Sequence, residues 1–297
     1  MTARAPRLYD AFWSEAGAEG EGGRRLPGRV ESTEAVGRNS AFYAALGRVL
    51  GRRGVSLESF CPPEDAVARR VLEEYGSMFV AENVRTPPVV VFRDAAEVLA
   101  FQLEATWRAG VFGGTIIELQ PSALDALSAA RDEARELGLD ITPRGGAEAA
   151  RRGFEDSLRL WRSRCDPALE HWHARGRLTT EEAERVRCLE LREQVAAVLE
   201  LEGRGVFFSK DLSKSILYSV AAPGASQHLS MLAFDAAEFR DARVRQLLAR
   251  RGWFQTVLSD LPHFTYLGLQ EDELPARGLR AVETDGQVFW IPDTEKP

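Results

Sequence analysis

The spacing of apolar residues changes near Gly205, and this change limits the folds that the chain can adopt. Before Gly205, apolar residues recur every three or four positions, as in amphipathic helices. After it, short runs rich in Val, Ile, Phe and Tyr are typical of strands. Because helices come early and strands late, the sequence predicts an α+β fold. It has a helix-rich N-terminal part and a C-terminal antiparallel sheet flanked by helices.

The expected helices have start and stop signals such as proline or acids in the first turn and glycine after the end. One helix is expected to be interrupted near Pro167 and another to break near Leu189. Helices are predicted over 40–53, 62–76, 94–107, 122–137, 147–176, 179–203 and 242–252. Strands are predicted over 87–92, 115–119, 139–142, 206–209, 215–224, 229–239, 253–258, 263–269 and 287–292.

Composition narrows the classes of partner. The chain has 297 residues, 44% of them hydrophobic and 28% charged, which is ordinary for a soluble globular protein. Its net charge of −7 argues against nucleic acid, because phosphate binding uses clustered Lys and Arg. No run approaches the roughly 20 apolar residues of a membrane span. No signal peptide is visible at the start, so we expect either a cytoplasmic protein or one whose export segment is missing from this sequence.

Two of the four histidines, His228 and His263, lie close in sequence to aspartates. The stretch PGASQHLSMLAFD places His228 seven residues before Asp235, and Asp260 lies three residues before His263. Two imidazoles and one carboxylate suffice for a hydrolytic zinc, which keeps its fourth position open for water. We therefore predict that His228, Asp235 and His263 are the ligands of one Zn²⁺ per chain. Asp260 is the spare acid that accepts a proton.

Two further residues are candidates for contacting a substrate. Arg144 follows a predicted strand and precedes two glycines that allow close approach, so we expect it to bind substrate or a developing oxyanion. Arg151 and Arg152 are close enough in sequence to take the same role. Ser226 is expected to orient or contact the substrate through its hydroxyl.

These motifs resemble those of a known family. Ser226-x-His228-x6-Asp235 is similar to the S-x-H-x-x-G-x-A-x-D signature of zinc D-alanyl-D-alanine carboxypeptidases and dipeptidases of the VanY and VanX type. Asp260-x-x-His263-Phe264 resembles that family's E-x-x-H element, and the stretch 119–146 resembles its helix-then-strand entry to a substrate-binding arginine. The resemblance covers roughly residues 115–270.

The resemblance implies a hedgehog-like peptidase fold for residues 115–297. Apolar spacing predicts a helical extension over 41–114, and the Gly-, Arg-, Glu- and Ala-rich composition predicts a flexible segment over 1–40. The resemblance implies a D,D- or L,D-carboxypeptidase that removes a terminal D-amino acid from peptidoglycan stem peptides by a metal-activated water. It also implies a cell-envelope or periplasmic location, and it leaves the oligomeric state open.

Two departures from the family pattern bear on activity. Met231 stands where the family has glycine, and we expect it to reshape the pocket beside the metal. Asp260 stands where the family has glutamate, which sets the carboxylate about 1.5 Å further back. Because a general base needs hydrogen-bond reach, the alternative is a metal-binding wall-fragment module with weak or no catalysis.

A third hypothesis is a helical interaction protein, in which the histidines and aspartates are structural. A single histidine in an apolar run is more often a hydrogen-bonded core residue than a ligand. His171 and His173 are read as structural or surface residues, because positions i and i+2 point to different faces of a helix.

Overall fold

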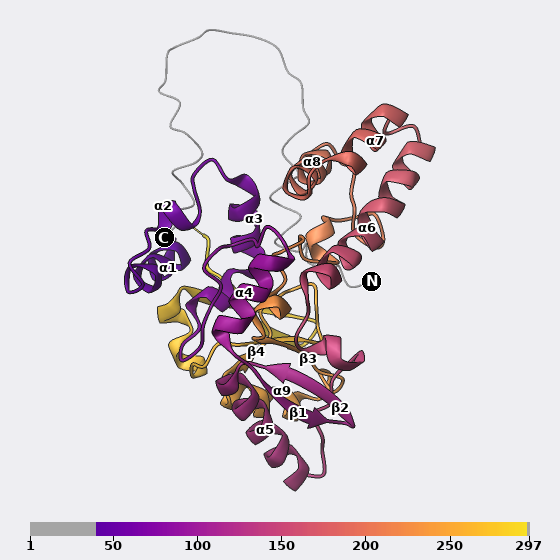
Figure 1. Ribbon diagram of the computed structural model, residues 1–297. Helices are drawn as coiled ribbons and strands as arrows, with labels where there is room; N and C mark the ends of the chain where they lie inside the picture. Colours follow the sequence, from indigo (N-terminus) through magenta and orange to yellow (C-terminus); the bar gives the residue numbers. More distant parts are fainter. Residues whose placement is uncertain (1–39, 296–297) are drawn as a thin grey trace, which may run out of the picture. The chain divides into compact units, whose positions relative to one another are not determined.

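The protein combines α-helices with small antiparallel sheets (Figure 1), which confirms the α+β class. The structure, a computed structural model, describes residues 40–295. Residues 1–39 of the expected flexible segment lie outside the described part. The described residues belong to one compact unit, from 34 to 297.

Four N-terminal helices confirm the sequence predictions for this region or add to them. Side-chain oxygens of Ser40, Ser56, Asp65 and Asp94 accept hydrogen bonds from backbone amides in the first turns, as N-caps do. The helices are α1 (Ala41–Gly51), α2 (Leu57–Phe60), α3 (Ala66–Tyr75) and α4 (Ala95–Ala105).

The chain then forms a β-hairpin that packs against a long helix. Strand β1 (Arg108–Phe112) was not expected from the sequence, whereas β2 (Thr115–Leu119) and α5 (Pro121–Glu136) were. Gly113 and Gly114 form the two-residue turn with positive φ angles of 54° and 80°, which other residues rarely adopt. The domain boundary expected between 114 and 115 falls in this turn.

Three helices form the next layer: α6 (Phe154–Ala174), α7 (Thr180–Cys188) and α8 (Leu191–Gly203). The break near Leu189 is confirmed, but the interruption near Pro167 was wrong, because α6 runs through it. Pro167 has no N–H for the carbonyl of Ser163. The Arg164 guanidinium donates to that oxygen at 3.3 Å instead, so the helix continues with the carbonyl satisfied.

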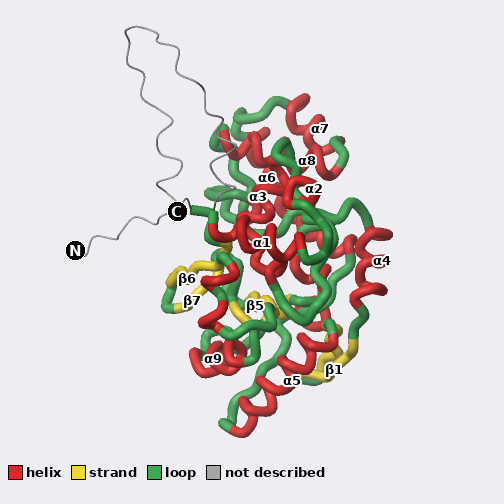
Figure 2. Tube along the Cα trace, turned by 90° about the vertical axis from the view of Figure 1, so that its left-hand side faces the viewer, coloured by secondary structure: helices red, strands yellow, loops and turns green. Residues whose placement is uncertain are grey.

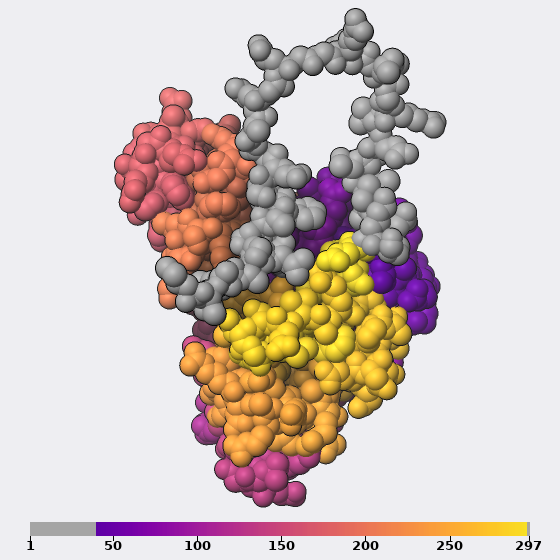
Figure 3. Space-filling model, turned by 180° about the vertical axis from the view of Figure 1, so that it is seen from behind, coloured from indigo at the N-terminus to yellow at the C-terminus, as the bar shows by residue number. Residues whose placement is uncertain are grey.

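The C-terminal strands form two separate small sheets (Figure 2). Strand β5 (His263–Tyr266) lies between β3 (Ala233–Asp235) and β4 (Trp253–Phe254), with α9 (Ala242–Arg250) connecting β3 to β4. β6 (Leu279–Thr284) and β7 (Gln287–Pro292) form a hairpin. Figure 3 shows this C-terminal part beside the N-terminal helices, in keeping with the contacts of β7 with α3.

Several predicted strands are wrong. Residues 87–92, 139–142, 206–209 and 215–224 form loops, apart from a short 3-10 helix at Ile216–Tyr218. Their apolar side chains are buried all the same: Phe208, Ile216 and Ala222 are inaccessible to solvent. An apolar run indicates that a segment is buried. A segment that is buried against helices does not have to pair with another strand.

Candidate metal centre

Sheet register brings Asp235 and His263 together. They are directly opposite each other on the antiparallel strands β3 and β5. The neighbouring pair, Phe234 and Phe264, is buried in the hydrophobic cluster that also contains Trp253. Because side chains alternate between the faces of a sheet, Asp235 and His263 point together away from that cluster.

His228 reaches the same place from a turn. A strand was predicted from residue 229, but residues Gln227–Ser230 form a 3-10 helix. It follows Gly224, whose φ is +82° and whose carbonyl accepts from the Phe92 amide. A Cβ on Gly224 would lie 2.0 Å from the Phe92 carbonyl oxygen, so only glycine permits this close approach.

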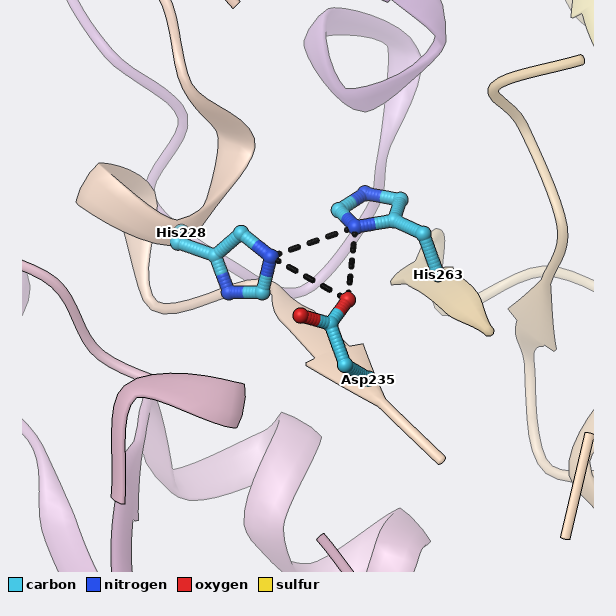
Figure 4. Close-up of side chains that lie close together, drawn as sticks. All are labelled: His228, Asp235 and His263. Atoms are coloured by element: carbon cyan, nitrogen blue, oxygen red, sulfur yellow. Dashed lines mark hydrogen bonds and ion pairs between the residues drawn. The ribbon is translucent and has the colours of Figure 1, made fainter. Parts of the chain in front are cut away.

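The three side chains converge on one point (Figure 4). His228 Nε2 lies 3.2 Å from His263 Nδ1, and Asp235 Oδ1 lies 3.3 Å and 3.1 Å from these two nitrogens. An ion held tetrahedrally at zinc–ligand distances has ligand atoms about 3.3 Å apart. The observed triangle has that size, so the group could hold a metal ion.

Hydrogen bonds fix which imidazole nitrogens face this point. His228 Nδ1 lies 2.7 Å from the Ala150 carbonyl, which can only accept, so Nδ1 carries the proton. His263 Nε2 lies 2.8 Å from Gln227 Oε1, and Gln227 is oriented by its own amide donating to the Tyr75 carbonyl. His228 Nε2 and His263 Nδ1 are therefore lone-pair atoms in the neutral side chains.

When both imidazoles are neutral, three lone-pair atoms therefore face one another, and an imidazole that is protonated here donates to Asp235. All three residues are buried, and burial lowers the pKa of His228 to about 4. Burial acts to raise the pKa of Asp235, but its hydrogen bonds and charge interactions with the two histidines hold that pKa well below its ordinary value. With both imidazoles neutral, the group offers two imidazole nitrogens and a carboxylate oxygen, which is a donor set that a divalent cation matches.

Arg152 holds the other oxygen of the carboxylate. Its guanidinium donates to Asp235 Oδ2 at 2.8 Å and to the Glu148 carbonyl, and its amide donates to the His228 carbonyl. Asp235 is therefore oriented with Oδ1 toward the imidazoles. Such outer contacts orient ligands in metal sites and tune their affinity.

A cleft of about 590 Å³ opens beside the group, and Asp235 forms part of its wall. Asp260 and Arg144 also line it. Asp260 is exposed at the surface of the cleft. Packing around its carboxyl nevertheless raises its pKa, and the nearby Asp235 adds to this rise. The Arg144 amide donates to the Asp235 carbonyl, and its guanidinium lies over the Phe239 ring.

Three other expectations meet different outcomes. Ser226 is buried in the turn before His228 and is not among the residues that line the cleft. Met231 packs in a hydrophobic cluster with Phe101 and Leu229, so it does not reshape the cleft as expected. His171 and His173 lie on α6, where His171 is half-buried and His173 is exposed.

Sequence reasoning missed the groups that orient the ligands. Gln227 precedes His228 and has no distinguishing spacing, and the Ala150 carbonyl has no sequence signature at all. Arg152 was considered only as an alternative to Arg144, and the structure gives it a contact with Asp235.

Comparisons with known proteins do not place the chain in a family: no protein family, curated protein or solved structure matches it. In the described part of the chain, no helix has the length and apolar character to cross a membrane.

Proposed function

We propose that the protein is a zinc-dependent D,D- or L,D-carboxypeptidase that removes a terminal D-amino acid from peptidoglycan stem peptides. The observation that carries the proposal is the convergence of three ligand atoms, His228 Nε2, His263 Nδ1 and Asp235 Oδ1, beside an open cleft. The sequence resemblance to zinc D-alanyl-D-alanine peptidases supplies the substrate class.

The three ligands would hold one zinc, with Arg152 and Gln227 keeping Asp235 and His263 in orientation. Bound zinc would lower the pKa of a water molecule and polarise the peptide carbonyl. Asp260 would accept a proton in the cleft and return it to the leaving amine. A raised pKa suits a group that both accepts and donates.

Arg144 would bind the substrate's terminal carboxylate. It lines the same cleft as Asp260 and Asp235, and its backbone is tied to Asp235 by the hydrogen bond from its amide. A guanidinium presents a planar fork of donors to a carboxylate, which makes arginine suited to this role.

Two measurements on purified protein test the proposal. Elemental analysis of the wild type should find one zinc per chain, and His228→Ala should have lost it. Zinc-loaded wild type should release D-alanine from N-acetyl-D-Ala-D-Ala, a chelator should stop the release, and Asp260→Asn should bind zinc without releasing D-alanine. A wild type that holds zinc but hydrolyses no D-amino-acid peptide would count against the peptidase.

The second candidate is a metal-containing module that binds wall fragments without turnover. It is favoured by the shorter Asp260 side chain, which has no hydrogen bond to the ligand group among residues 40–295. Asp260→Glu distinguishes the two candidates. Hydrolysis that appears only in Asp260→Glu favours the binding module, whereas hydrolysis in the wild type that Asp260→Ala abolishes favours the peptidase.

A further inference from the structure

The cleft beside the metal-ligand group carries an unusual excess of positive charge. Two carboxylates line it, Asp235 and Asp260, and one of them is already paired with Arg152. Four cationic side chains line the same cleft: Arg144, Arg164, Lys210 and Arg240. The whole chain has a net charge of −7 and only three lysines, so this cluster does not follow from the overall composition.

None of these four cations has an acidic partner within 4 Å among residues 40–295. Elsewhere many arginines are paired, for example Arg131 with Asp140 and Arg250 with Glu133. Arg144 and Arg240 instead both lie over the ring of Phe239, at 5.3 and 5.4 Å from its centroid. Their guanidinium groups therefore keep donors free for a ligand.

Arg164 comes from the helical layer rather than from the sheet. One of its terminal nitrogens is held by the carbonyl of Ser163, which Pro167 leaves without its helical donor, and by the Ser163 hydroxyl. Its Nε atom is shielded from water and has no hydrogen-bond partner in the described structure. The other terminal nitrogen, Nη2, has no hydrogen-bond partner among residues 40–295, so it can donate to an anionic ligand in the cleft.

Lys210 is presented by a turn that is held rigidly by its own hydrogen bonds. The Ser209 hydroxyl accepts from the amides of Ser213 and Lys214 and donates to Asp211. The Lys210 amide donates to the Ser219 hydroxyl. Lys210 therefore lines the cleft from a turn that several hydrogen bonds hold in place.

We infer that the substrate of this site is a peptide with two anionic groups. One is its terminal carboxylate, taken by the Arg144 and Arg240 pair. The other is a carboxylate or phosphate elsewhere on the peptide, taken by Arg164 and Lys210. This inference rests on the proposed function for the identity of the peptide, but the anion-binding cations themselves do not depend on catalysis.

Binding of a charge series tests the inference. Zinc-loaded Asp260→Asn protein is titrated calorimetrically with N-acetyl-D-Ala-D-Ala amide, N-acetyl-D-Ala-D-Ala and N-succinyl-D-Ala-D-Ala, which carry no, one and two carboxylates. N-acetyl-phosphoseryl-D-Ala-D-Ala is a further probe that separates phosphate from carboxylate as the second group. We expect each added charge to tighten binding by about tenfold, the effect of one good charge-assisted contact.

Arg164→Gln and Lys210→Gln, each added to the Asp260→Asn protein, should lower its affinity for the succinyl peptide to its affinity for the acetyl peptide. The matched controls are Arg162→Gln, an exposed position on the same helix, and Lys214→Gln, an exposed position in the same turn; neither lines the cleft. Lys210 is exposed, so its variant tests the inference even if Arg164→Gln fails to fold.

Equal affinity for the acetyl peptide and both two-anion peptides would overturn the inference. Equal losses of affinity in the control variants would also overturn it, and so would an absence of binding by every peptide. The proposed function fails separately. If the wild type hydrolyses none of the peptides while the charge series still orders their affinities, the anion subsite stands and the peptidase does not.

Discussion

The side-chain carbonyl of Gln227 lies 2.8 Å from Nε2 of His263 and so decides which nitrogen of that imidazole faces Asp235. The Gln227 amide donates to the Tyr75 carbonyl, and the Thr265 hydroxyl donates to the Gln227 carbonyl, so the side chain is held from both ends. The lone pair of His263 Nδ1 is thereby directed at the carboxylate before any ion binds.

Gln227→Leu should weaken zinc binding by about 10- to 100-fold, because loss of an orienting partner typically has an effect of this size. Competition with a chelating dye measures the dissociation constant. Gln255→Leu is the matched control: it is also a buried glutamine near the sheet, but it bonds to Leu261 and Gln287 rather than to an imidazole. An unchanged affinity in Gln227→Leu would contradict the assigned orientation.

Zinc should stabilise the folded protein through the same three ligands. Since an ion that binds only the native state adds RT ln(1 + [Zn]/Kd), free zinc at 100 times Kd should raise the free energy of unfolding by about 2.7 kcal/mol. Urea denaturation with and without zinc measures this gain. We expect His228→Ala and Asp235→Asn to lose it and Asp260→Ala to keep it. A gain that survives His228→Ala would place the ion elsewhere.

The sequence predicted which three side chains converge better than it predicted their surroundings. Histidine and aspartate are scarce enough near one another that the spacing of His228, Asp235 and His263 was informative. Their orienting partners are a glutamine and a backbone carbonyl, which occur everywhere and acquire a role only through the fold. The conformation at His228 was missed for a related reason, since a buried 3-10 turn has the same apolar neighbours as a strand.

The helices were predictable because capping residues and apolar spacing are local. α3, for example, begins after Asp65, whose carboxylate caps it, and ends at Gly76. Strand pairing depends on segments far apart in the chain, so the strands predicted at 206–209 and 215–224 became loops. Continuation of α6 through Pro167 depends on the Arg164 side chain replacing a backbone donor, which apolar spacing does not encode.

Met231 occupies the position at which the resembling family has glycine, and its backbone is left-handed, with φ 59° and ψ 29°. That conformation costs a residue with a Cβ about 1–2 kcal/mol, but glycine adopts it freely. Met231→Ala should lower the free energy of unfolding by about 2–5 kcal/mol, because it leaves a cavity at a fully buried position. The cost of the left-handed backbone remains in this variant. Met231→Gly should be more stable than Met231→Ala by about 1 kcal/mol.

The usual order is the reverse: at positions with negative φ, a glycine variant is less stable than an alanine variant. Chemical denaturation of both variants measures it. Zinc affinity should be unchanged in each, because the Met231 side chain packs in a core cluster rather than in the cleft. If the glycine variant is the less stable, the left-handed backbone at this position is wrong.

Glu202 should make the free energy of unfolding depend on pH, and comparing substitutions of Glu202 and Glu200 separates its contribution. Burial raises the pKa of this carboxyl to about 7, even though it accepts a hydrogen bond from the amide of Ile216. The native state therefore keeps a proton that the unfolded chain releases near its ordinary pKa of about 4.3. Because the native state binds more protons in this window, the free energy of unfolding falls as pH rises through it, by roughly 3–4 kcal/mol in all.

Glu202→Gln removes this dependence, so the free-energy difference between variant and wild type should shift by roughly 3–4 kcal/mol in favour of the variant from pH 4 to pH 8. Glu200→Gln on the same helix is exposed and should show no such trend. Glu202 is tied to the segment that carries Lys210, so proteolysis of that segment should become faster in the wild type above pH 7. A parallel pH profile for Glu202→Gln and Glu200→Gln would show that Glu202 stays ionised throughout.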